Sequence, residues 1–157
     1  MAEDGSVVGV VESDPLDRLG FLLARHGAFA NSRVHHALAS CGLTPRQGTT
    51  LMLVGKSGHM AQQALAAALE VDPSIMVGIL NELESAQLVE RRRDPSDRRR
   101  HIVAITDEGS HVLAKAQAAV SDVEQGLFAD FAPEEIAALR GLLARVRTSS
   151  GDAVHSG

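Results

Sequence analysis

Residues 90–106 read ERRRDPSDRRRHIVAIT, so that two groups of three arginines flank the short sequence DPSD. Proline at the second position of a four-residue stretch is typical of a β-turn. After this turn, Val103 and Ile105 recur with the period of two that puts apolar residues on one face of a strand. The segments 89–93 and 101–105 therefore predict a β-hairpin whose tip carries the arginines.

This basic hairpin belongs to an acidic chain. The formal net charge of the 157 residues is −5, whereas residues 91–100 hold six arginines and two aspartates, a local charge of +4 that leaves −9 elsewhere. Charge segregated in this way steers one surface toward phosphates and limits loose association by the remainder. With no Trp, no Tyr and four Phe, the chain has few rings on which unpaired bases can stack, so duplex nucleic acid is the better candidate.

Two helices are predicted directly before the hairpin. Residues 61–70 are rich in alanine, and the following Asp72-Pro73 supplies an N-cap and a first-turn proline for a helix that reaches Ala86. Two short helices joined by a tight turn are typical of a helix-turn-helix. A further helix is expected before them, because Thr44 and Gln47 form a capping-box pattern, and we expect Gly55 to close it.

Longer helices flank this region on both sides. One is expected from Asp14 to about residue 40 as a single helix of about 26 residues, or roughly 39 Å, which is longer than one small core needs and suggests a second chain. Thr106 is expected to cap a helix that runs to about Phe128, and residues 132–147 predict a last amphipathic helix. The predicted fold class is mainly α with a small β-wing, in the order α-α-α-α-β-β-α-α.

We expect one domain over residues 1–157, with dimerisation helices at about 14–40 and 107–147, a winged lobe at about 44–106, and mobile tails at 1–12 and 148–157. The single cysteine excludes an intramolecular disulfide and favours a reducing, cytoplasmic compartment. No apolar run is long enough for a membrane span and the N-terminus lacks a signal-peptide pattern, so no membrane partner is expected.

A helix-turn-helix followed at once by a basic hairpin is a winged-helix arrangement, and the chain resembles the multiple-antibiotic-resistance regulator (MarR) family. The resemblance is carried by GLTPRQ (42–47), ALAAALEVDPSIMVGILNELE (64–84), LVERRRDPSDRRRHIVAIT (88–106) and the following DEG. It implies a homodimer of interlocking helices whose two winged lobes straddle double-stranded DNA. It also implies a repressor that a ligand releases from a pseudo-palindromic operator.

The second helix of the motif is expected to read the DNA. A buried stripe of Met76, Ile79, Leu80 and Leu83 leaves the opposite positions to face the major groove, namely Ser74, Ile75, Val77, Gly78 and Asn81. The family often places Ser, Thr and Arg where this chain has Val77 and Gly78. We therefore expect readout by contact with thymine methyl groups, close backbone approach and DNA shape.

Wing residues are expected to contact the DNA on either side of that groove. Arg98 and Arg99 would enter a minor groove, Asp97 would orient a neighbouring guanidinium, and Arg91, Arg93 and Arg100 would meet phosphates. The alternative is a solvated hairpin tip without a partner. Two further departures from the family, Ala61 where a Ser or Thr cap is usual and Gln87 in place of a frequent glycine, leave the predicted fold unchanged; the missing cap costs about 1 kcal/mol.

The resemblance also implies a pocket for an aromatic or anionic effector between the dimer helices and the lobe. Arg25, His26, Phe29 and Arg46 lie on the segments that would line it, although each is equally explained as an interface ion pair or a core residue. No cofactor is expected.

Other functions fit the sequence less well. Cys41 suggests a thiol-oxidation sensor, but the chain lacks the tyrosines that accompany the cysteine in such relatives, and a small hydrophobe at a helix end is the simpler explanation. Neighbouring His35 and His36 point about 100° apart on a helix, and no H-x3-H pair is present, so no metal site is expected. The chain has no GxSxG, HExxH or glycine-rich phosphate loop, which argues against an enzyme. The remaining rival is a winged helix that contacts only proteins.

Overall fold

The computed structural model of the chain describes residues 14–147. The segments 1–12 and 148–157, for which the sequence predicts mobility, lie outside these residues. The elements follow one another as η1 (Pro15–Asp17), α1 (Leu19–Ser40), α2 (Pro45–Ser57), β1 (His59–Ala61), α3 (Gln62–Ala68), α4 (Pro73–Ser85), β2 (Val89–Arg93), β3 (His101–Ile105), α5 (Asp107–Leu127) and α6 (Pro133–Leu143).

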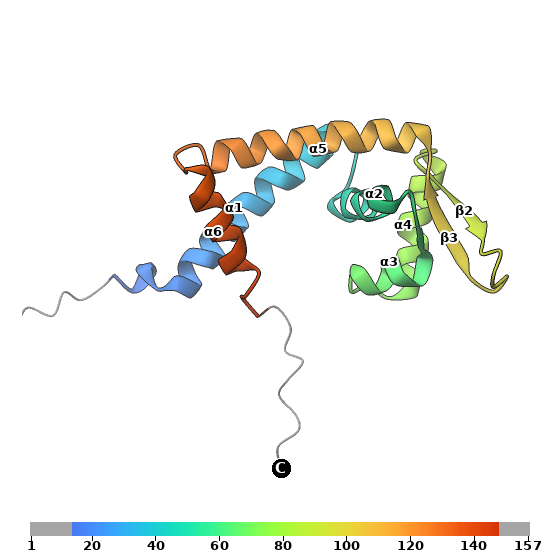
Figure 1. Ribbon diagram of the computed structural model, residues 1–157, viewed down its shortest axis with the longest axis horizontal. Helices are drawn as coiled ribbons and strands as arrows, with labels where there is room; N and C mark the ends of the chain where they lie inside the picture. Colours follow the sequence, from blue (N-terminus) through green and yellow to red (C-terminus); the bar gives the residue numbers. More distant parts are fainter. Residues whose placement is uncertain (1–13, 148–157) are drawn as a thin grey trace, which may run out of the picture.

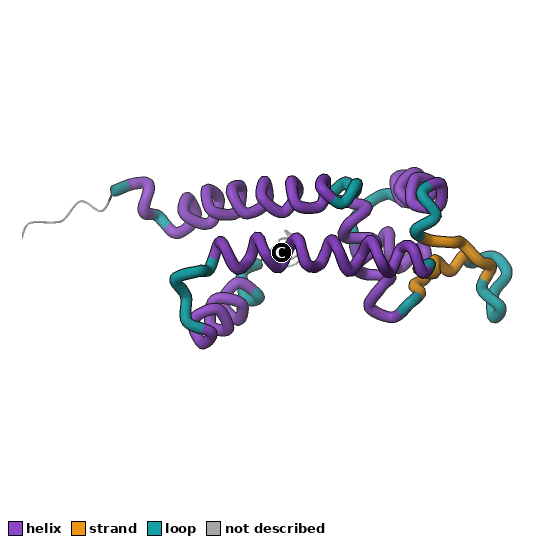
Figure 2. The backbone as a smooth tube through the Cα atoms, turned by 90° about the horizontal axis from the view of Figure 1, so that it is seen from above, coloured by secondary structure: helices purple, strands orange, loops and turns teal. Residues whose placement is uncertain are grey.

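The molecule has two parts, which we call the helical arm and the winged lobe (Figure 1). The arm consists of α1, α5 and α6, with α5 running beside α1 and α6 folding back from the far end of α5. The lobe comprises α2, α3, α4 and the three strands, and it lies at the other end of α5. Figure 2 shows α1 and α5 side by side from a second direction. The fold is mainly helical with a small β-wing, as the sequence predicts.

The hydrophobic core lies almost entirely in the winged lobe. The expected stripe on α4 is confirmed, because Met76 and Leu80 are fully buried and Leu83 and Ile79 nearly so. They pack in one cluster with side chains of α2, α3 and the sheet, including Leu51, Leu65 and Val103. The arm contributes less: α6 buries none of its residues and α1 buries only Leu38, while α5 buries Gly109, Leu113 and Ala116 in its first half. Within residues 14–147, the buried core therefore lies in the lobe and in the adjoining part of the arm, and the far end of the arm has none.

The wing is a three-stranded antiparallel sheet in the order β1-β3-β2. Strands β2 and β3 have the predicted bounds, and Arg91 pairs with Val103 at the middle of the hairpin. The connection between them covers residues 94–100, so it is longer than the predicted four-residue turn. Strand β1 was not predicted, because three residues carry no period; it pairs with β3 through Met60 and Val103.

Helix α2 begins as predicted and ends later. Thr44 N donates to Gln47 Oε1 at 3.0 Å and Gln47 N donates to Thr44 Oγ1 at 3.3 Å, which confirms the capping box. The prediction that Gly55 closes the helix is wrong, because Gly58, with φ of +80°, follows the last helical residue. Gly55 instead marks a close approach of α2 to α5, since a Cβ there would lie 2.2 Å from Leu113 Cδ2.

The arm helices differ from the prediction at their ends. A single helix from Asp14 is wrong: the Asp14 side chain caps the short η1, and Arg18, with ψ of 133°, separates it from α1. Helix α1 therefore has 22 residues, or roughly 33 Å. Helix α6 ends at Leu143, so the predicted extension to 147 is wrong and Val146 lies beyond it. The Thr106 cap of α5 is confirmed, with Gly109 N donating to Thr106 Oγ1 at 2.9 Å.

The departures noted at Ala61 and Gln87 have structural counterparts. Ala61 is the N-cap of α3 and makes no side-chain capping bond, and Asp72, expected to cap α4, occupies the N-cap position without one. Gln87 adopts φ of +61° in the turn between α4 and β2. A left-handed conformation is easiest for glycine, so the Cβ of Gln87 is disfavoured at this position.

Candidate nucleic-acid interface

The outer face of α4 is an open surface of small and apolar residues. Ser74, Ile75, Val77, Gly78 and Asn81 are all exposed. Within residues 44–106, Ile75 and Val77 are the only exposed large hydrophobic residues, at 38% and 37%. A Cβ added at Gly78 would meet nothing within 4 Å, so the helix backbone is accessible there. The five positions predicted to read the major groove thus share the side of α4 that faces away from the core.

Strand β2 is tied to α4 by Arg91 and Glu84. Arg91 Nε and Nη2 donate to Glu84 Oε2 at 2.9 and 2.5 Å, and the backbone N of Arg91 donates to Glu84 Oε1 at 3.0 Å. The Arg91 guanidinium lowers the pKa of the Glu84 carboxyl below its ordinary value, although partial burial acts in the opposite direction. The Arg91 side chain is 23% exposed, and its phosphate contact remains a prediction.

The same guanidinium reaches a residue predicted to contact bases. Arg91 Nη2 donates to Asn81 Oδ1 at 2.5 Å. The sequence predicts a base contact for Asn81 and a phosphate contact for Arg91, and the structure joins these two side chains to each other. Glu84, which links them, was missed by the sequence analysis, because a carboxylate seven residues before an arginine has no distinctive spacing across a helix-to-strand turn.

Helix α4 is held from its other side by α2. Gln47 Nε2 donates to Glu82 Oε2 at 2.7 Å while Gln47 Oε1 accepts from the Thr44 backbone. The capping residue of α2 thus also fixes the neighbouring helix. This second role was not predicted, because a capping box is a local pattern and the partner lies 35 residues away.

The hairpin tip holds the most exposed positive charge. Arg93, Arg98 and Arg99 are exposed and form no ion pair within residues 14–147. Asp97 contacts two neighbouring arginines: its Oδ2 lies 3.4 Å from Arg100 Nε, and its Oδ1 accepts from Arg99 N at 3.0 Å.

A second aspartate shapes the turn itself. Asp94 Oδ1 accepts from both the backbone N and the Oγ of Ser96, at 2.8 and 2.6 Å, and these hydrogen bonds lower the pKa of the Asp94 carboxyl. Beside the tip, Arg92 pairs with Glu90 on the strand. The turn is therefore ordered by its own carboxylates while three guanidinium groups point into solvent.

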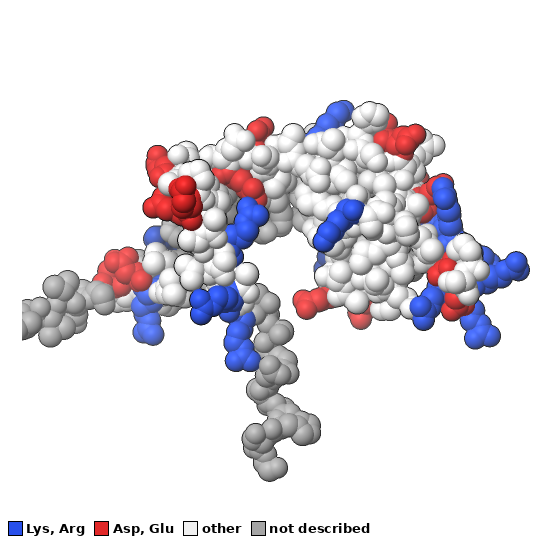
Figure 3. All heavy atoms as spheres, viewed as in Figure 1, with Lys and Arg blue, Asp and Glu red and all other residues white. Residues whose placement is uncertain are grey.

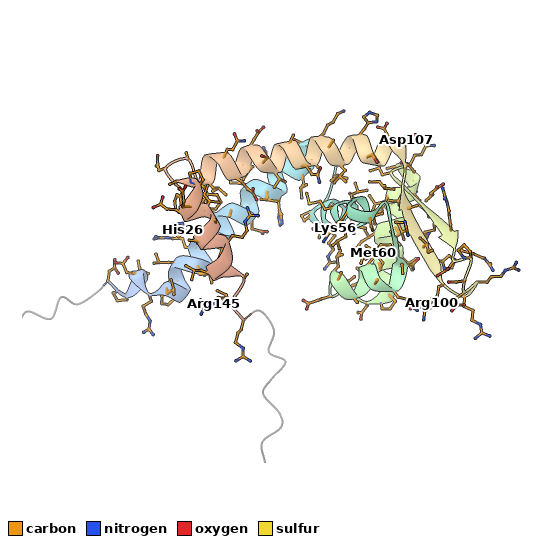
Figure 4. All side chains as sticks on the ribbon, viewed as in Figure 1. His26, Lys56, Met60, Arg100, Asp107 and Arg145 are labelled. Carbon is orange, nitrogen blue, oxygen red and sulfur yellow. The ribbon has the colours of Figure 1, made fainter. Side chains whose placement is uncertain are left out.

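The charges are distributed unevenly over the surface. In Figure 3 the blue arginines gather at the end of the hairpin, and the red carboxylates gather at the corner between α5 and α6. Figure 4 places Arg100 at the hairpin tip, at the opposite end of the molecule from His26 on the arm. Exposed positive charge is therefore concentrated at the end of the wing.

The residues predicted to hold an effector lie outside two grooves of the structure. Arg25, His26 and Phe29 are exposed on α1, and Arg46 is exposed at the start of α2. None of the four lines the groove between α5 and α6 or the smaller one between α3 and α4. The first of these grooves is lined by Ser121, Glu124, Gln125, Phe128, Ala129, Ile136, Leu139, Arg140 and Leu143.

Cys41 lies half-buried at the C-terminal end of α1, with its Sγ 3.9 Å from Ser40 Oγ. Within residues 14–147 no group of three or more His, Cys, Asp or Glu side chains is arranged to hold a metal ion. In that same range no single helix is long and apolar enough to cross a membrane; α3 and α4 reach the required length and composition only as a pair, which is bent by 111°.

Comparison with known proteins places this arrangement among solved regulators. A model of the MarR family matches residues 43–101. The putative transcriptional regulatory protein for the hcr operon of Thauera aromatica is 32% identical over 138 residues, which cover 87% of this chain and 83% of the relative. A crystal structure of a MarR-family transcriptional regulator from Rhodococcus sp. RHA1 is 32% identical, with a TM-score of 0.74, covering 83% of this chain and 93% of the other.

CouR of Rhodococcus jostii RHA1 has been solved with two ligands. The structure bound to p-coumaroyl-CoA is 33% identical, with a TM-score of 0.72, and covers 85% of this chain and 96% of the other. The transcriptional repressor CouR bound to a 23-mer DNA duplex is also 33% identical, with a TM-score of 0.73, and covers 80% of this chain and 89% of the other. The same fold thus accommodates a duplex and an aromatic thioester in a similar protein.

Proposed function

Because this chain belongs to the MarR family of transcriptional regulators, we propose that it binds double-stranded DNA through α4 and the hairpin of its winged lobe. In this proposal the exposed face of α4 enters the major groove, and Arg98 and Arg99 reach the adjacent minor groove or backbone. Arg93 and Arg100 supply phosphate contacts.

The observation that carries the proposal is the position of α4 beside the arginine-rich tip. The helix is anchored from both sides, by Gln47 through Glu82 and by Arg91 through Glu84, so that its outer face is rigidly presented. The exposed guanidinium groups of Arg98 and Arg99 lie on the hairpin that is tied to the same helix. The outer face of α4 and the arginines of the hairpin therefore belong to one connected unit.

The helical arm supports a homodimer. Within residues 14–147 it exposes large apolar residues, including Leu19 at 80%, Phe29 at 58% and Leu142 at 58%. Apolar surface of this extent marks a protein interface. Two chains joined through their arms present two copies of α4, so the operator is proposed to be a pseudo-palindrome with half-sites about 34 Å apart.

A small-molecule effector and a repressor role complete the proposal. The motivation is CouR, a transcriptional repressor that has been solved with p-coumaroyl-CoA. We propose an aromatic or anionic effector near Arg25, His26, Phe29 and Arg46, where the arm meets the lobe in the dimer. The protein acts as a regulator and not as an enzyme, and since it works on DNA we place it in the cytoplasm.

The rival is a winged helix that contacts only proteins. A protein-binding surface is usually built around a buried aromatic anchor that a polar rim surrounds. The hairpin tip has no aromatic residue and carries three unpaired arginines among the described residues, which favours a polyanion.

The proposal is tested by fluorescence anisotropy. The protein is titrated against the intergenic duplex upstream of its own gene and against a scrambled duplex, over a series of salt concentrations. Binding to the first duplex at least about a thousandfold tighter than to the second, and weakening with salt, is the expected result. Equal and weak binding to both, together with no selection from a randomised duplex library, would overturn it.

A further inference from the structure

The hydrogen bond between Arg91 and Asn81 determines how the amide of Asn81 is turned. A guanidinium group has five N–H donors and no acceptor, so it can face only the oxygen of an amide. Arg91 Nη2 lies 2.5 Å from Asn81 Oδ1. The nitrogen of the amide must then be the atom left for other partners. The chemistry of Arg91 thus settles an orientation that the side chain of an exposed asparagine usually leaves open.

Arg91 is itself held in place by bonds that do not involve Asn81. Its Nε and its backbone N both donate to the Glu84 carboxylate, at 2.9 and 3.0 Å. Glu84 and Asn81 lie three residues apart on α4, so the two acceptors are on neighbouring turns of one helix face. The guanidinium donors of Arg91 are engaged by Glu84 and Asn81, and the side chain is only 23% exposed. The side chain is therefore held by its own protein.

Asn81 consequently presents a restricted pattern to its surroundings. The side chain is exposed, and the two N–H groups of Nδ2 have no partner within residues 14–147. An asparagine that reads adenine uses its oxygen for the adenine N6 amino group and its nitrogen for N7. Here the amide oxygen of Asn81 accepts from Arg91 on strand β2, so only the Nδ2 donor remains for contact with a base.

We propose that Arg91 is a positioning residue that turns the Asn81 amide so that α4 selects guanine rather than adenine at the base pair facing Asn81. Guanine offers two acceptors, N7 and O6, to the amide nitrogen, whereas adenine places its N6 amino group next to N7 and opposes a second donor. This inference rests on the proposed reading of the major groove by α4. It gives Arg91 a role in base choice and not in phosphate binding.

The test begins with sites selected by the wild-type dimer from a randomised duplex library. Anisotropy titrations then measure affinity for the four base pairs at each position of the selected site. At one position in each half-site we expect a preference for guanine over adenine of about tenfold. Failure of the library to yield any site would overturn the proposed function itself, whereas a selected site without such a position would overturn only this inference.

Two variants test whether the guanine preference depends on the hydrogen bond between Arg91 and Asn81. Asn81→Asp keeps an acceptor for Arg91 but removes both N–H donors, so the guanine preference at that position should disappear while the melting temperature is maintained. Arg91→Met keeps an apolar stem and releases the amide oxygen, so preference at the same position should move toward adenine. The matched control is Arg92→Met, the same change one residue along in the pair with Glu90, which should leave the preference intact.

The salt dependence separates positioning from phosphate contact. Removal of one protein–phosphate interaction lowers the slope of log K against log salt by about one unit. For Arg91→Met the slope should equal that of the wild type, whereas a change in slope without a change in base preference would make Arg91 a phosphate ligand and overturn the inference. Melting curves of both variants establish that the compared proteins are folded.

Discussion

Thr106 Oγ1 donates a 2.6 Å hydrogen bond to the backbone oxygen of Gln87 and, through its lone pair, accepts from Gly109 N at 2.9 Å. One hydroxyl therefore caps α5 and also holds the turn that leads from α4 into β2. Because α5 belongs to the arm and α4 to the winged lobe, this bond fixes the lobe to the arm at the point where the hairpin begins.

The turn held by Thr106 stores backbone strain at Gln87, whose φ is +61°. Gln87→Gly removes the Cβ that disfavours this conformation, and the backbone oxygen needed by Thr106 is kept. Allowing for the greater freedom of glycine in the unfolded chain, we expect the free energy of unfolding to rise by about 0.5 to 1 kcal/mol. Gln87→Ala, which retains a Cβ, should produce no such rise in a denaturant titration.

Removing the exposed arginines of the wing tests the DNA clamp. The double variant Arg98→Ala, Arg99→Ala should bind the operator more weakly, and its salt slope should fall by about one unit for each arginine that binds a phosphate in the wild type. Because both side chains are exposed and form no ion pair within residues 14–147, helicity and dimer mass should remain unchanged. Unaltered affinity in anisotropy titrations would show that the tip does not contact DNA.

The Glu84–Arg91 pair makes part of the stability depend on pH. The pKa of Glu84 is lowered in the folded protein from its ordinary value of 4.5. The contribution of the charged carboxylate is therefore fully present above that value and is lost as the pH falls through the lower folded pKa.

Glu84→Gln should accordingly reduce the free energy of unfolding by about 1 kcal/mol at pH 7. The difference from wild type should narrow as the pH falls below about 4.5. Thermal melts between pH 7 and pH 3 measure it. Glu90→Gln, in the exposed pair with Arg92, is the control and should have a small effect, since exposed ion pairs contribute little.

Gly78 permits a test of close approach between α4 and DNA. A Cβ at this position meets no atom within 4 Å of its own chain, so Gly78→Ala should raise helix stability by about 1 kcal/mol. If the backbone lies against the base edges, the added methyl group should lower operator affinity while the melting temperature rises. A gain in stability without any loss of affinity would remove Gly78 from the contact surface.

Gly109→Ala provides the contrast. Its Cβ would lie 2.0 Å from the backbone oxygen of Leu88, in the first turn of α5. This variant should lose stability by steric conflict with backbone, which melting curves would show.

A charge on the arm should separate the chains. Leu142 is 58% exposed on α6, and Leu142→Glu places a carboxylate where the proposal puts a dimer contact. Sedimentation velocity should show a shift toward monomer. Ile75→Glu, an equally drastic change at an exposed apolar residue of the lobe, should leave the dimer intact and weaken DNA binding instead. A dimer that is indifferent to Leu142→Glu would place the interface elsewhere.

Local patterns in the sequence predicted much of this fold. The Thr44 and Thr106 caps, the buried stripe of α4 and both strands of the hairpin depend on residues within one or two turns of each other, and all were recognised. The end of α2 was misplaced because a glycine pattern does not distinguish a helix end from a close packing contact. Gly55 faces Leu113, and only the folded chain brings the two together.

The sequence predicted where the residues of the candidate site lie, but it did not predict the hydrogen bonds that join them. The exposed face of α4 and the arginine tip followed from periodicity and charge. The connections that orient them did not, because Gln47 to Glu82 and Arg91 to Asn81 join different elements. The sequence groups Arg91 with Arg93 and Arg100 as phosphate contacts, whereas the structure engages Arg91 within the protein and leaves Arg98 and Arg99 free of ion pairs among the described residues.

The bare arm has a consequence for how the protein responds to its own abundance. Helix α6 has no buried residue among the residues that the structure describes, so under the proposed dimer the burial of the arm and the binding of a second chain are one equilibrium. At low copy number the concentration of dimer then grows with the square of the chain concentration, so that doubling expression raises the dimer concentration about fourfold. Occupancy of the operator should therefore rise steeply over a narrow range of expression, a threshold that arises from the exposed apolar residues of the arm.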